Sequence, residues 1–426
     1  MTAAAESNRI AQLIESAERA QTNGRGAEAA RLLGEAQALA PTDHRVLTAL
    51  GIRALRLNDL PTARQHLERA AGREPRSPAL WLNLAYCRRM QGDAPGELAA
   101  LDQALALEPR FYPAVLQKAS WLEQHGKPKE AAFLYDVFLH CLPPPSQTPP
   151  ALKSAIEHAQ RVVSADHDAL GELIAARIAG AAVDPGASRA RFDHCIEVLL
   201  GRRRVFTAQP TFMHFPKLAA IEFFERRDFP WLDALEAGSS SMREELLALL
   251  EDPGTDSEIV PYVDYPAHQP LDQWRTLNRS KQWGAYYLLK DGVRIESHLA
   301  RCPRTAALLA AAPLADVPGQ APTAFFSLLQ PHTRIPPHTG VTNTRVVVHV
   351  PLVIPQGCGF RVGSETRSWK LGEAWVFDDT IEHEAWNESD EPRYILIIDI
   401  WNPLLTEAER EWVRIATTAV AEYRRA

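Results

Sequence analysis

The sequence predicts a multidomain α + β protein, in which an α-helical repeat solenoid precedes a β-rich domain with flanking helices. Three observations lead to this fold class. Residues recur with a 34-residue step up to residue 143, five prolines fall within residues 142–150, and short β-branched and aromatic runs are concentrated after residue 320. A length of 426 residues is typical of two or three domains.

The first third of the chain contains an internal repeat. Glu97 departs from it, because alanine stands at the matching position of the other units, so we expect looser packing in the third unit. The pattern resembles the tetratricopeptide repeat, which implies four pairs of amphipathic helices in a solenoid over residues 1–143. The recurring residues are prolines (Pro41, Pro75, Pro109, Pro143), small residues (Ala17, Gly51, Ala85, Ala119) and turn residues (Gly24, Asn58, Gly92, Gly126).

Residues 144–185 form the next predicted segment. The sequence LPPPSQTPP at residues 142–150 cannot continue a helix, because proline lacks the backbone N–H and clashes with the preceding turn. Apolar residues at helical spacing follow it. We therefore predict a Pro-rich linker and a helical segment, and a cap on the solenoid is one role open to that segment.

The β-rich domain is predicted over residues 186–426, with its core at about 320–403. The strand-like runs are β-branched, aromatic and broken by Gly, Pro, Asp and Asn, as in an antiparallel sandwich or barrel. Since the preceding residues read as helical, we expect 190–320 to pack helices against the outside of the β-core. The runs are 324–329, 344–354, 359–362, 373–377 and 394–401.

Composition narrows the class of protein. The net charge of −7 argues against a nucleic-acid partner held by a general positive field. The five cysteines form no CxxC pair, so a disulfide framework is not expected. Because the chain has no run of about 18 apolar residues and no basic leader, we expect no membrane segment and a cytoplasmic location.

Two histidines and one arginine are the candidate site residues from the pattern alone. Pro336 and Pro337 stiffen the approach to His338, and His383 follows a strand that ends in acids. Arg393 opens the last long strand. Two imidazoles on different strands can meet at the mouth of a β-barrel and bind iron or zinc, and a buried arginine suits a carboxylate. Taken alone, each of these residues is more often structural.

Dense sequence blocks then resemble the aspartyl/asparaginyl β-hydroxylase family, with weaker similarity back to about residue 209. The resemblance implies a double-stranded β-helix (jelly-roll) oxygenase that uses Fe(II), 2-oxoglutarate and O2 to hydroxylate an unactivated C–H bond. The blocks are IPPHTGVTNTR (335–345), HVPLVIP (349–355), GCGFRVGSETRSW (357–369), EAWVFDDTIEHEAW (373–386) and DIWNP (399–403).

The resemblance also assigns roles to individual residues. It implies His338 and His383 as iron ligands, with Gly340 where most related oxygenases carry a third, carboxylate ligand. It implies that Arg393 and Ser327 hold 2-oxoglutarate, with His349 close to it. Asp379 matches a catalytic acid near the metal, and Arg345 matches an arginine on the substrate side.

The chain departs from the family pattern at one position, and three functions are open. Val347 stands where animal members of the family carry a second arginine. Because that charge is missing, the resemblance predicts the type of reaction more firmly than it predicts an aspartyl substrate. The favoured function is hydroxylation of a peptide or protein side chain, with the repeats recruiting a polypeptide partner. The alternatives are hydroxylation of a small molecule or lipid acyl chain, and a non-catalytic scaffold.

Overall fold

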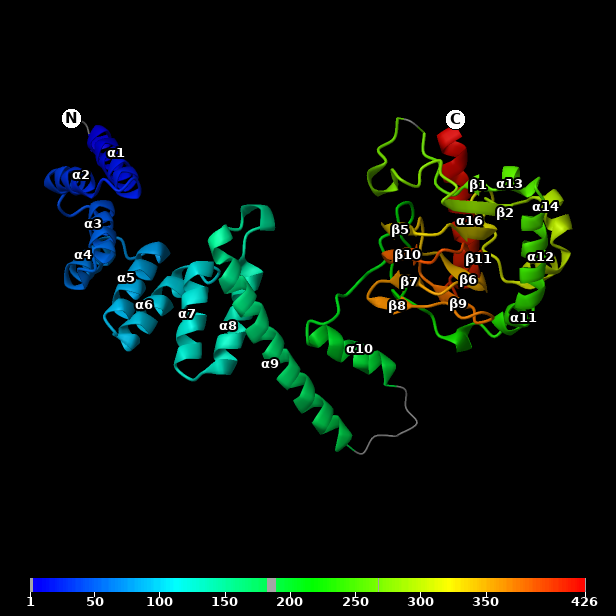
Figure 1. Ribbon diagram of the computed structural model, residues 1–426, viewed down its shortest axis with the longest axis horizontal. Helices are drawn as coiled ribbons and strands as arrows, with labels where there is room; N and C mark the ends of the chain where they lie inside the picture. The colour runs from blue at the N-terminus through cyan, green and yellow to red at the C-terminus, as the bar shows by residue number, and fades with distance from the viewer. Residues whose placement is uncertain (1–2, 182–188, 267, 426) are drawn as a thin grey trace. The chain divides into compact units, whose positions relative to one another are not determined.

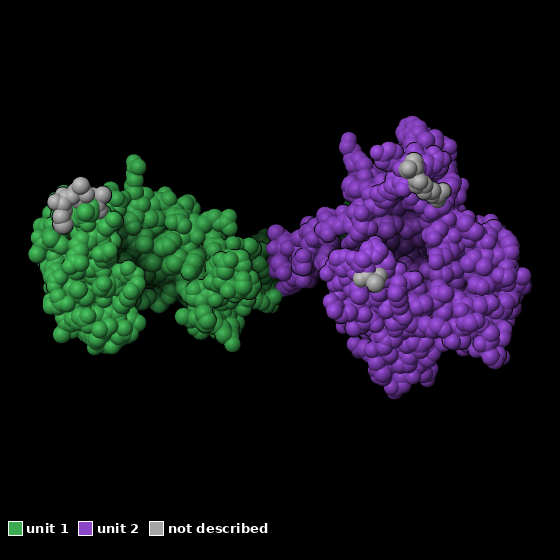
Figure 2. Space-filling view, turned by 90° about the horizontal axis from the view of Figure 1, so that it is seen from above, with its two compact units in different colours: residues 1–192 green, residues 193–426 purple. Residues whose placement is uncertain are grey.

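The computed structural model describes residues 3–181, 189–266 and 268–425. The chain forms two compact units, residues 1–192 and 193–426 (Figure 2). The boundary predicted at residue 143 therefore falls inside the first unit, and the one predicted at residue 186 lies outside the described residues.

Helices form the first unit (Figure 1). They are α1 (Ala3–Thr22), α2 (Gly26–Leu39), α3 (His44–Arg56), α4 (Leu60–Arg73), α5 (Pro78–Met90), α6 (Ala94–Leu107), α7 (Tyr112–Gln124), α8 (Pro128–Cys141), the short turns η1 (Pro145–Gln147) and η2 (Pro150–Leu152), α9 (Lys153–Ala179) and α10 (Ala190–Leu199), which crosses into the second unit.

Four helix pairs, α1/α2 to α7/α8, form the predicted tetratricopeptide-repeat solenoid. Each predicted turn residue has a positive φ, between 59° at Asn58 and 74° at Gly24, which glycine and asparagine tolerate best. The crossing positions need small side chains, since a Cβ on Gly51 would lie 2.7 Å from Leu67 Cγ. The recurring prolines stand two residues beyond the ends of α2, α4, α6 and α8.

Two details of the first unit bear on the expectations, and only the first, the packing at Glu97, differs from them. Glu97 is buried, and Gln117 donates a hydrogen bond of 2.9 Å to its carboxylate, so a polar contact fills the place where other units carry alanine. Helix α9 is part of the solenoid core, because Ala159 and Val163 pack with Phe138 of α8. The segment after the prolines thus covers the apolar face of the last repeat.

Two antiparallel sheets form the core of the second unit. The larger sheet has the order β1-β2-β4-β11-β6-β9, with β3 paired to β2, and the smaller has the order β5-β10-β7-β8. The strands are β1 (Val260–Pro261), β2 (Trp283–Lys290), β3 (Val293–Arg294), β4 (Ala324–Leu329), β5 (Thr333–His338), β6 (Arg345–Val353), β7 (Cys358–Val362), β8 (Glu365–Arg367), β9 (Trp375–Phe377), β10 (His383–Asn387) and β11 (Arg393–Trp401).

The two sheets pack face to face, as in an antiparallel sandwich. Leu329, Val347 and Ile395 of the larger sheet join Ile335 and Phe360 of the smaller sheet in one buried cluster. The other helices and turns of this unit are η3 (Arg226–Asp228), α11 (Leu232–Ala237), α12 (Ser239–Glu251), α13 (Thr255–Glu258), η4 (Asp272–Trp274), α14 (Glu296–Arg301), α15 (Pro303–Ala311) and α16 (Glu407–Arg425).

The expectation for residues 190–320 needs one correction. Helices α11, α12, α14 and α15 do cover the outer face of the larger sheet, through apolar residues such as Leu232, Leu246 and Leu309. The same stretch also supplies β2, which pairs with β4 and lies outside the predicted core range of about 320–403. Its sequence WGAYYLLK is buried on both faces, so it lacks the polar alternation that marks a strand.

Candidate functional site

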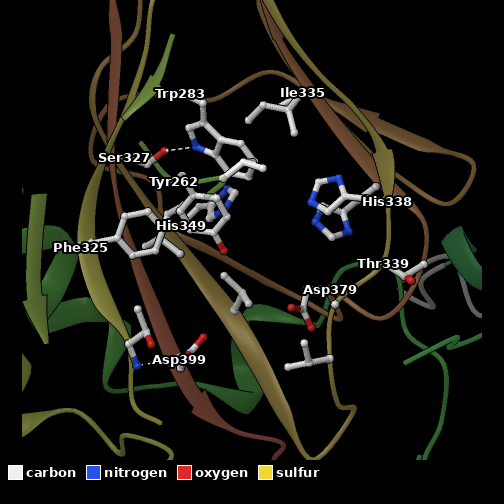
Figure 3. A pocket seen from close by; sticks show the side chains of 18 of the residues that line it. Tyr262, Trp283, Phe325, Ser327, Ile335, His338, Thr339, His349, Asp379 and Asp399 are labelled. Atoms are coloured by element: carbon white, nitrogen blue, oxygen red, sulfur yellow. Dashed lines mark hydrogen bonds between the residues drawn. The ribbon is translucent and has the colours of Figure 1, made fainter. Parts of the chain in front are cut away.

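A cavity of about 580 Å³ opens into the second unit, and strands of both sheets line it. All seven residues singled out from the sequence lie on its wall: Ser327, His338, Arg345, His349, Asp379, His383 and Arg393. Figure 3 shows several of them projecting from different strands toward one space. Residues up to 66 positions apart in the sequence are therefore brought together by the sandwich.

His338 and His383 lie side by side at the edge of the smaller sheet. They are paired across β5 and β10, and their ring centroids are 4.0 Å apart. In each residue the Nδ1 atom lies against a backbone carbonyl, 2.8 Å from Pro336 O for His338 and 3.0 Å from Ile381 O for His383. A carbonyl only accepts, so Nδ1 carries the proton and Nε2 keeps its lone pair.

Burial keeps both imidazoles neutral. It lowers the pKa of His338, and it lowers the pKa of His383 well below the ordinary value, with the neighbouring His338 adding to the effect. A neutral imidazole is the form that binds a metal ion. The pair therefore has the tautomer, the charge and the proximity of two metal ligands, although that role stays a prediction.

Arg393 is a buried cation without a protein anion. It is 1% exposed, and burial lowers its pKa to about 10, which leaves it charged at neutral pH. Its Nε has no hydrogen-bond partner, and among the described residues the guanidinium forms no ion pair. Since an uncompensated buried charge is costly, the position calls for an anionic ligand.

Ser327 is oriented by two donors. Its Oγ accepts a hydrogen bond from Trp283 Nε1 at 3.1 Å, drawn in Figure 3, and one from Arg393 Nη2 at 3.4 Å. Because Oγ acts as acceptor in both, its own proton is free for a ligand. Ser327 and Arg393 thus present donors to the same part of the cavity.

His349 lies beside this part of the wall. It is 5% exposed, its Nδ1 has no partner, and burial together with the nearby Arg393 lowers its pKa well below the ordinary value. Its ring packs against Phe360 and Phe377. It is therefore a neutral polar group with an unused nitrogen.

Asp379 fills the space next to Gly340. A Cβ built on Gly340 would lie 2.1 Å from Asp379 Oδ2, so the carboxylate occupies the place of a side chain at position 340. Asp379 Oδ1 is buried without a partner, and burial raises the pKa of this carboxyl to about 7 against the effect of Arg345. Position 340 thus requires glycine because Asp379 approaches it closely. Backbone conformation is not the reason, since the φ of Gly340 is not positive.

Arg345 is already paired. Its Nη1 lies 2.9 Å from Asp399 Oδ2, and both side chains are largely buried. In the pairing of β6 with β11, Asp399 stands opposite Val347, two residues along from Arg345. The arginine assigned to the substrate side therefore carries its own counter-ion.

An aromatic wall was not predicted as part of the site. Tyr262 stacks on Trp283 with ring centroids 4.0 Å apart, and Trp274 lies 5.0 Å from the His338 ring. Figure 3 shows Tyr262 and Phe325 across the cavity from His338. The concentration of tryptophan after residue 190 was the available signal, but it could not tell wall residues from core residues.

Comparison with known proteins supports the sequence resemblance. Residues 236–403 match the family model described as Aspartyl/Asparaginyl beta-hydroxylase. An ornithine lipid ester-linked acyl 2-hydroxylase of Rhizobium tropici is 30% identical over 199 residues, covering 46% of this chain and 66% of that protein. An aspartyl/asparaginyl beta-hydroxylase of Mus musculus is 32% identical over 186 residues, covering 42% and 24%.

Two further proteins show a likeness to this chain. Aspartate beta-hydroxylase domain-containing protein 2 of Homo sapiens is 36% identical over 135 residues, covering 31% of this chain and 37% of that protein. The chain therefore spans less than two thirds of the length of each of these relatives. A thermophilic TPR protein of Thermus thermophilus is 18% identical with a TM-score of 0.31, covering 45% and 97%, and this score is too low to support a conclusion.

Proposed function

Because the C-terminal unit of the chain belongs to the aspartyl/asparaginyl β-hydroxylase family, we propose that the protein is an Fe(II)- and 2-oxoglutarate-dependent hydroxylase of a peptide or protein side chain. The observation that carries the proposal is Arg393, a charged guanidinium buried without a protein carboxylate beside the free hydroxyl of Ser327. A ligand carboxylate would supply the missing anion.

The residues fit the implied metal. Two neutral imidazoles that present Nε2 suit iron(II). Within the described ranges no cluster of three or more His, Cys, Asp or Glu is arranged to hold a metal ion, so His338 and His383 are the whole proposed protein ligand set. When bound, iron(II) with 2-oxoglutarate would supply the oxidation chemistry that inserts oxygen into a C–H bond.

The chain's own groups then have distinct tasks. Arg393 and Ser327 would hold the distal carboxylate of 2-oxoglutarate and fix its orientation toward the histidines. The Pro336 and Ile381 carbonyls hold the imidazole rings in one tautomer. Asp379 offers a carboxyl oxygen beside Gly340 that can hydrogen-bond a small ligand at the missing third protein position.

The solenoid would recruit the substrate. It leaves large apolar side chains exposed, such as Phe133 at 67% and Leu57 at 59%, which is the kind of surface that repeat proteins use to bind polypeptides. Among the described residues no helix has the length and apolarity to cross a bilayer. The five free cysteines suit a reducing compartment, and we place the protein in the cytoplasm.

A second candidate is hydroxylation of a lipid acyl chain, which the printed name of the Rhizobium tropici relative favours. A non-catalytic scaffold is less well supported, because the two histidines, Arg393 and Ser327 converge on one cavity rather than being scattered or replaced. The two catalytic candidates share the metal and cosubstrate site and differ only in what enters the rest of the cavity.

Mass spectrometry tests the proposal. A His383→Ala variant is used to trap proteins from cells, and the trapped proteins are incubated with wild-type enzyme, Fe(II), 2-oxoglutarate and O2. We expect a +16 Da shift on a trapped side chain, and succinate in excess of the background without trapped protein by an equal amount. Succinate at the background rate seen without trapped protein, with no protein modified, would favour the small-molecule or lipid candidate. No succinate from the wild-type enzyme at all would refute the hydroxylase proposal.

A further inference from the structure

We propose that the side chain entering the cavity is an uncharged carboxamide rather than a carboxylate, and that Asp399 is the residue that sets this preference. The inference rests on the proposed hydroxylase function and goes on to the substrate of the same site. The evidence is the set of charged groups on the cavity wall that remain for the substrate after Arg393 has bound 2-oxoglutarate.

Arg345 already has a counter-ion on the cavity wall. A free arginine in a cavity would attract a carboxylate, but Arg345 Nη1 is 2.9 Å from Asp399 Oδ2. Asp399 is held in place by a second hydrogen bond of 3.0 Å from the backbone N–H of Thr323. A substrate carboxylate would therefore have to compete with a positioned, largely buried aspartate for the same guanidinium.

The second step is the absence of a replacement cation. On β6, the residues that face the cavity are Arg345, Val347 and His349, and the middle one is apolar. His349 is buried and packed against aromatic rings, so it offers no formal positive charge. Apart from the two arginines, the described wall contains one more side chain with a formal positive charge, the exposed Lys290 beside Tyr287.

The third step is the excess of acids. Asp291, Asp379 and Asp399 all line the cavity, whereas Arg345 and Lys290 are the bases left once Arg393 is occupied. The fourth acid of the wall, Asp264, is paired outward with Arg279 at 2.8 Å. A desolvated carboxylate brought into this setting would find Arg345 already paired with Asp399 and Arg393 already occupied, whereas an uncharged group needs no counter-ion.

The last step is hydrogen bonding. Arg345 Nε is a buried donor without a partner, and Asp379 Oδ1 is a buried acceptor without a partner on the same wall. Figure 3 shows Asp379 below His338 and Asp399 farther to the lower left of the same cavity. A carboxamide has both an acceptor oxygen and donor N–H groups, so it can satisfy both atoms, while a carboxylate can only accept.

The test compares two matched ligands by isothermal titration calorimetry. The probes are N-acetyl-asparagine N-methylamide and N-acetyl-aspartate N-methylamide, titrated at pH 7.5 without O2 into full-length protein with saturating Fe(II) and 2-oxoglutarate. The proteins are wild type, Asp399→Asn and Asp291→Asn. The last is a matched control, because it removes the same charge from the same cavity but leaves Arg345 paired, and asparagine tolerates its positive φ of 52°.

We expect wild type to bind the asparagine ligand at least about ten-fold more tightly, because the aspartate ligand meets no free cation. Asp399→Asn should shift the ratio toward the aspartate ligand by about ten-fold or more, and Asp291→Asn by less than about three-fold. If wild type binds neither ligand, binding of the aspartate ligand to Asp399→Asn but not to Asp291→Asn would also support the proposal.

Equal affinities in wild type, a preference for the aspartate ligand, or no binding of either ligand to wild type and Asp399→Asn would overturn it. If Asp399→Asn does not fold, the wild-type ratio alone decides. A separate titration of 2-oxoglutarate distinguishes the proposed function from the proposed carboxamide preference. If 2-oxoglutarate does not bind, the proposed function is refuted, whatever the preference between the two ligands.

Discussion

The interior of the solenoid is built from alanine, leucine and a few aromatic side chains, whereas the interior of the C-terminal unit includes Arg393, Asp399, His349 and His383. Helix pairs bury small residues from neighbouring turns, and the result is held by local packing. The sandwich brings ionisable groups from distant strands to one cavity, where several of their atoms have no partner. Among the described residues, several unpartnered atoms of the sandwich thus gather around a single cavity, which is where a ligand could satisfy them.

The largest expected effect follows from removing a proposed metal ligand. His338→Ala or His383→Ala should abolish succinate formation, because one remaining imidazole cannot hold the metal in place. The control is His332→Ala, an exposed loop histidine paired with Asp390, which should keep wild-type succinate formation. Succinate at the wild-type rate in either ligand variant would remove that residue from the metal site.

Gly340 tests how closely the cavity wall is packed. Gly340→Ala would place a Cβ 2.1 Å from Asp379 Oδ2, and relieving such a clash typically costs about 1–3 kcal/mol of folding free energy. Gly340→Asp should not improve succinate formation, although it adds a carboxylate at the missing position. The double variant Gly340→Ala/Asp379→Ala should recover much of the lost stability in chemical denaturation, and purely additive losses would contradict the contact.

Gly51 tests the corresponding contact in the solenoid. Gly51→Ala should cost about 1–3 kcal/mol, because the new Cβ would meet Leu67. Gly34→Ala is the matched control, since a Cβ there meets nothing within 4 Å and a helix-interior alanine should stabilise by about 0.4–1 kcal/mol. Both are measured by thermal melting, and a stabilising Gly51→Ala would show that the helices can separate without cost.

The smallest effect is expected from removing the solenoid. Deleting residues 1–181 keeps α10 whole and avoids exposing the α9 residues that pack on α8. We expect succinate formation without substrate to stay within about two-fold of wild type, since compact units with their own cores fold independently. Action on a large partner should weaken. An insoluble product would show that the solenoid is needed for the fold of the C-terminal unit.

The structure of the solenoid could be predicted from the sequence more completely than that of the C-terminal unit. The 34-residue step placed the turns and helix ends of the solenoid because each repeat is local. β4 and β11 were found because their runs are short and largely apolar, with aromatic residues in β4 and β-branched residues in β11. β2 was missed because it lacks polar alternation and stands apart in the chain from the other strand-like runs. The pair between Arg345 and Asp399 depends on the register of β6 and β11, which no local pattern contains.

The most direct measurement of the central claim is a titration of 2-oxoglutarate into Fe(II)-loaded protein without O2. Wild type should bind one molecule per chain, and Arg393→Ala should lose about 2–5 kcal/mol of binding free energy, or roughly 30- to 4000-fold in affinity. Arg393→Lys should recover only part of it, because an ammonium lacks the planar fork.

The control for that titration is Arg279→Ala, an exposed arginine whose loss should change the binding free energy by less than about 0.5 kcal/mol. Fe(II) affinity should be little changed in either variant. Near wild-type 2-oxoglutarate affinity in Arg393→Ala would contradict the account, since the buried guanidinium would then have no ligand to explain its place.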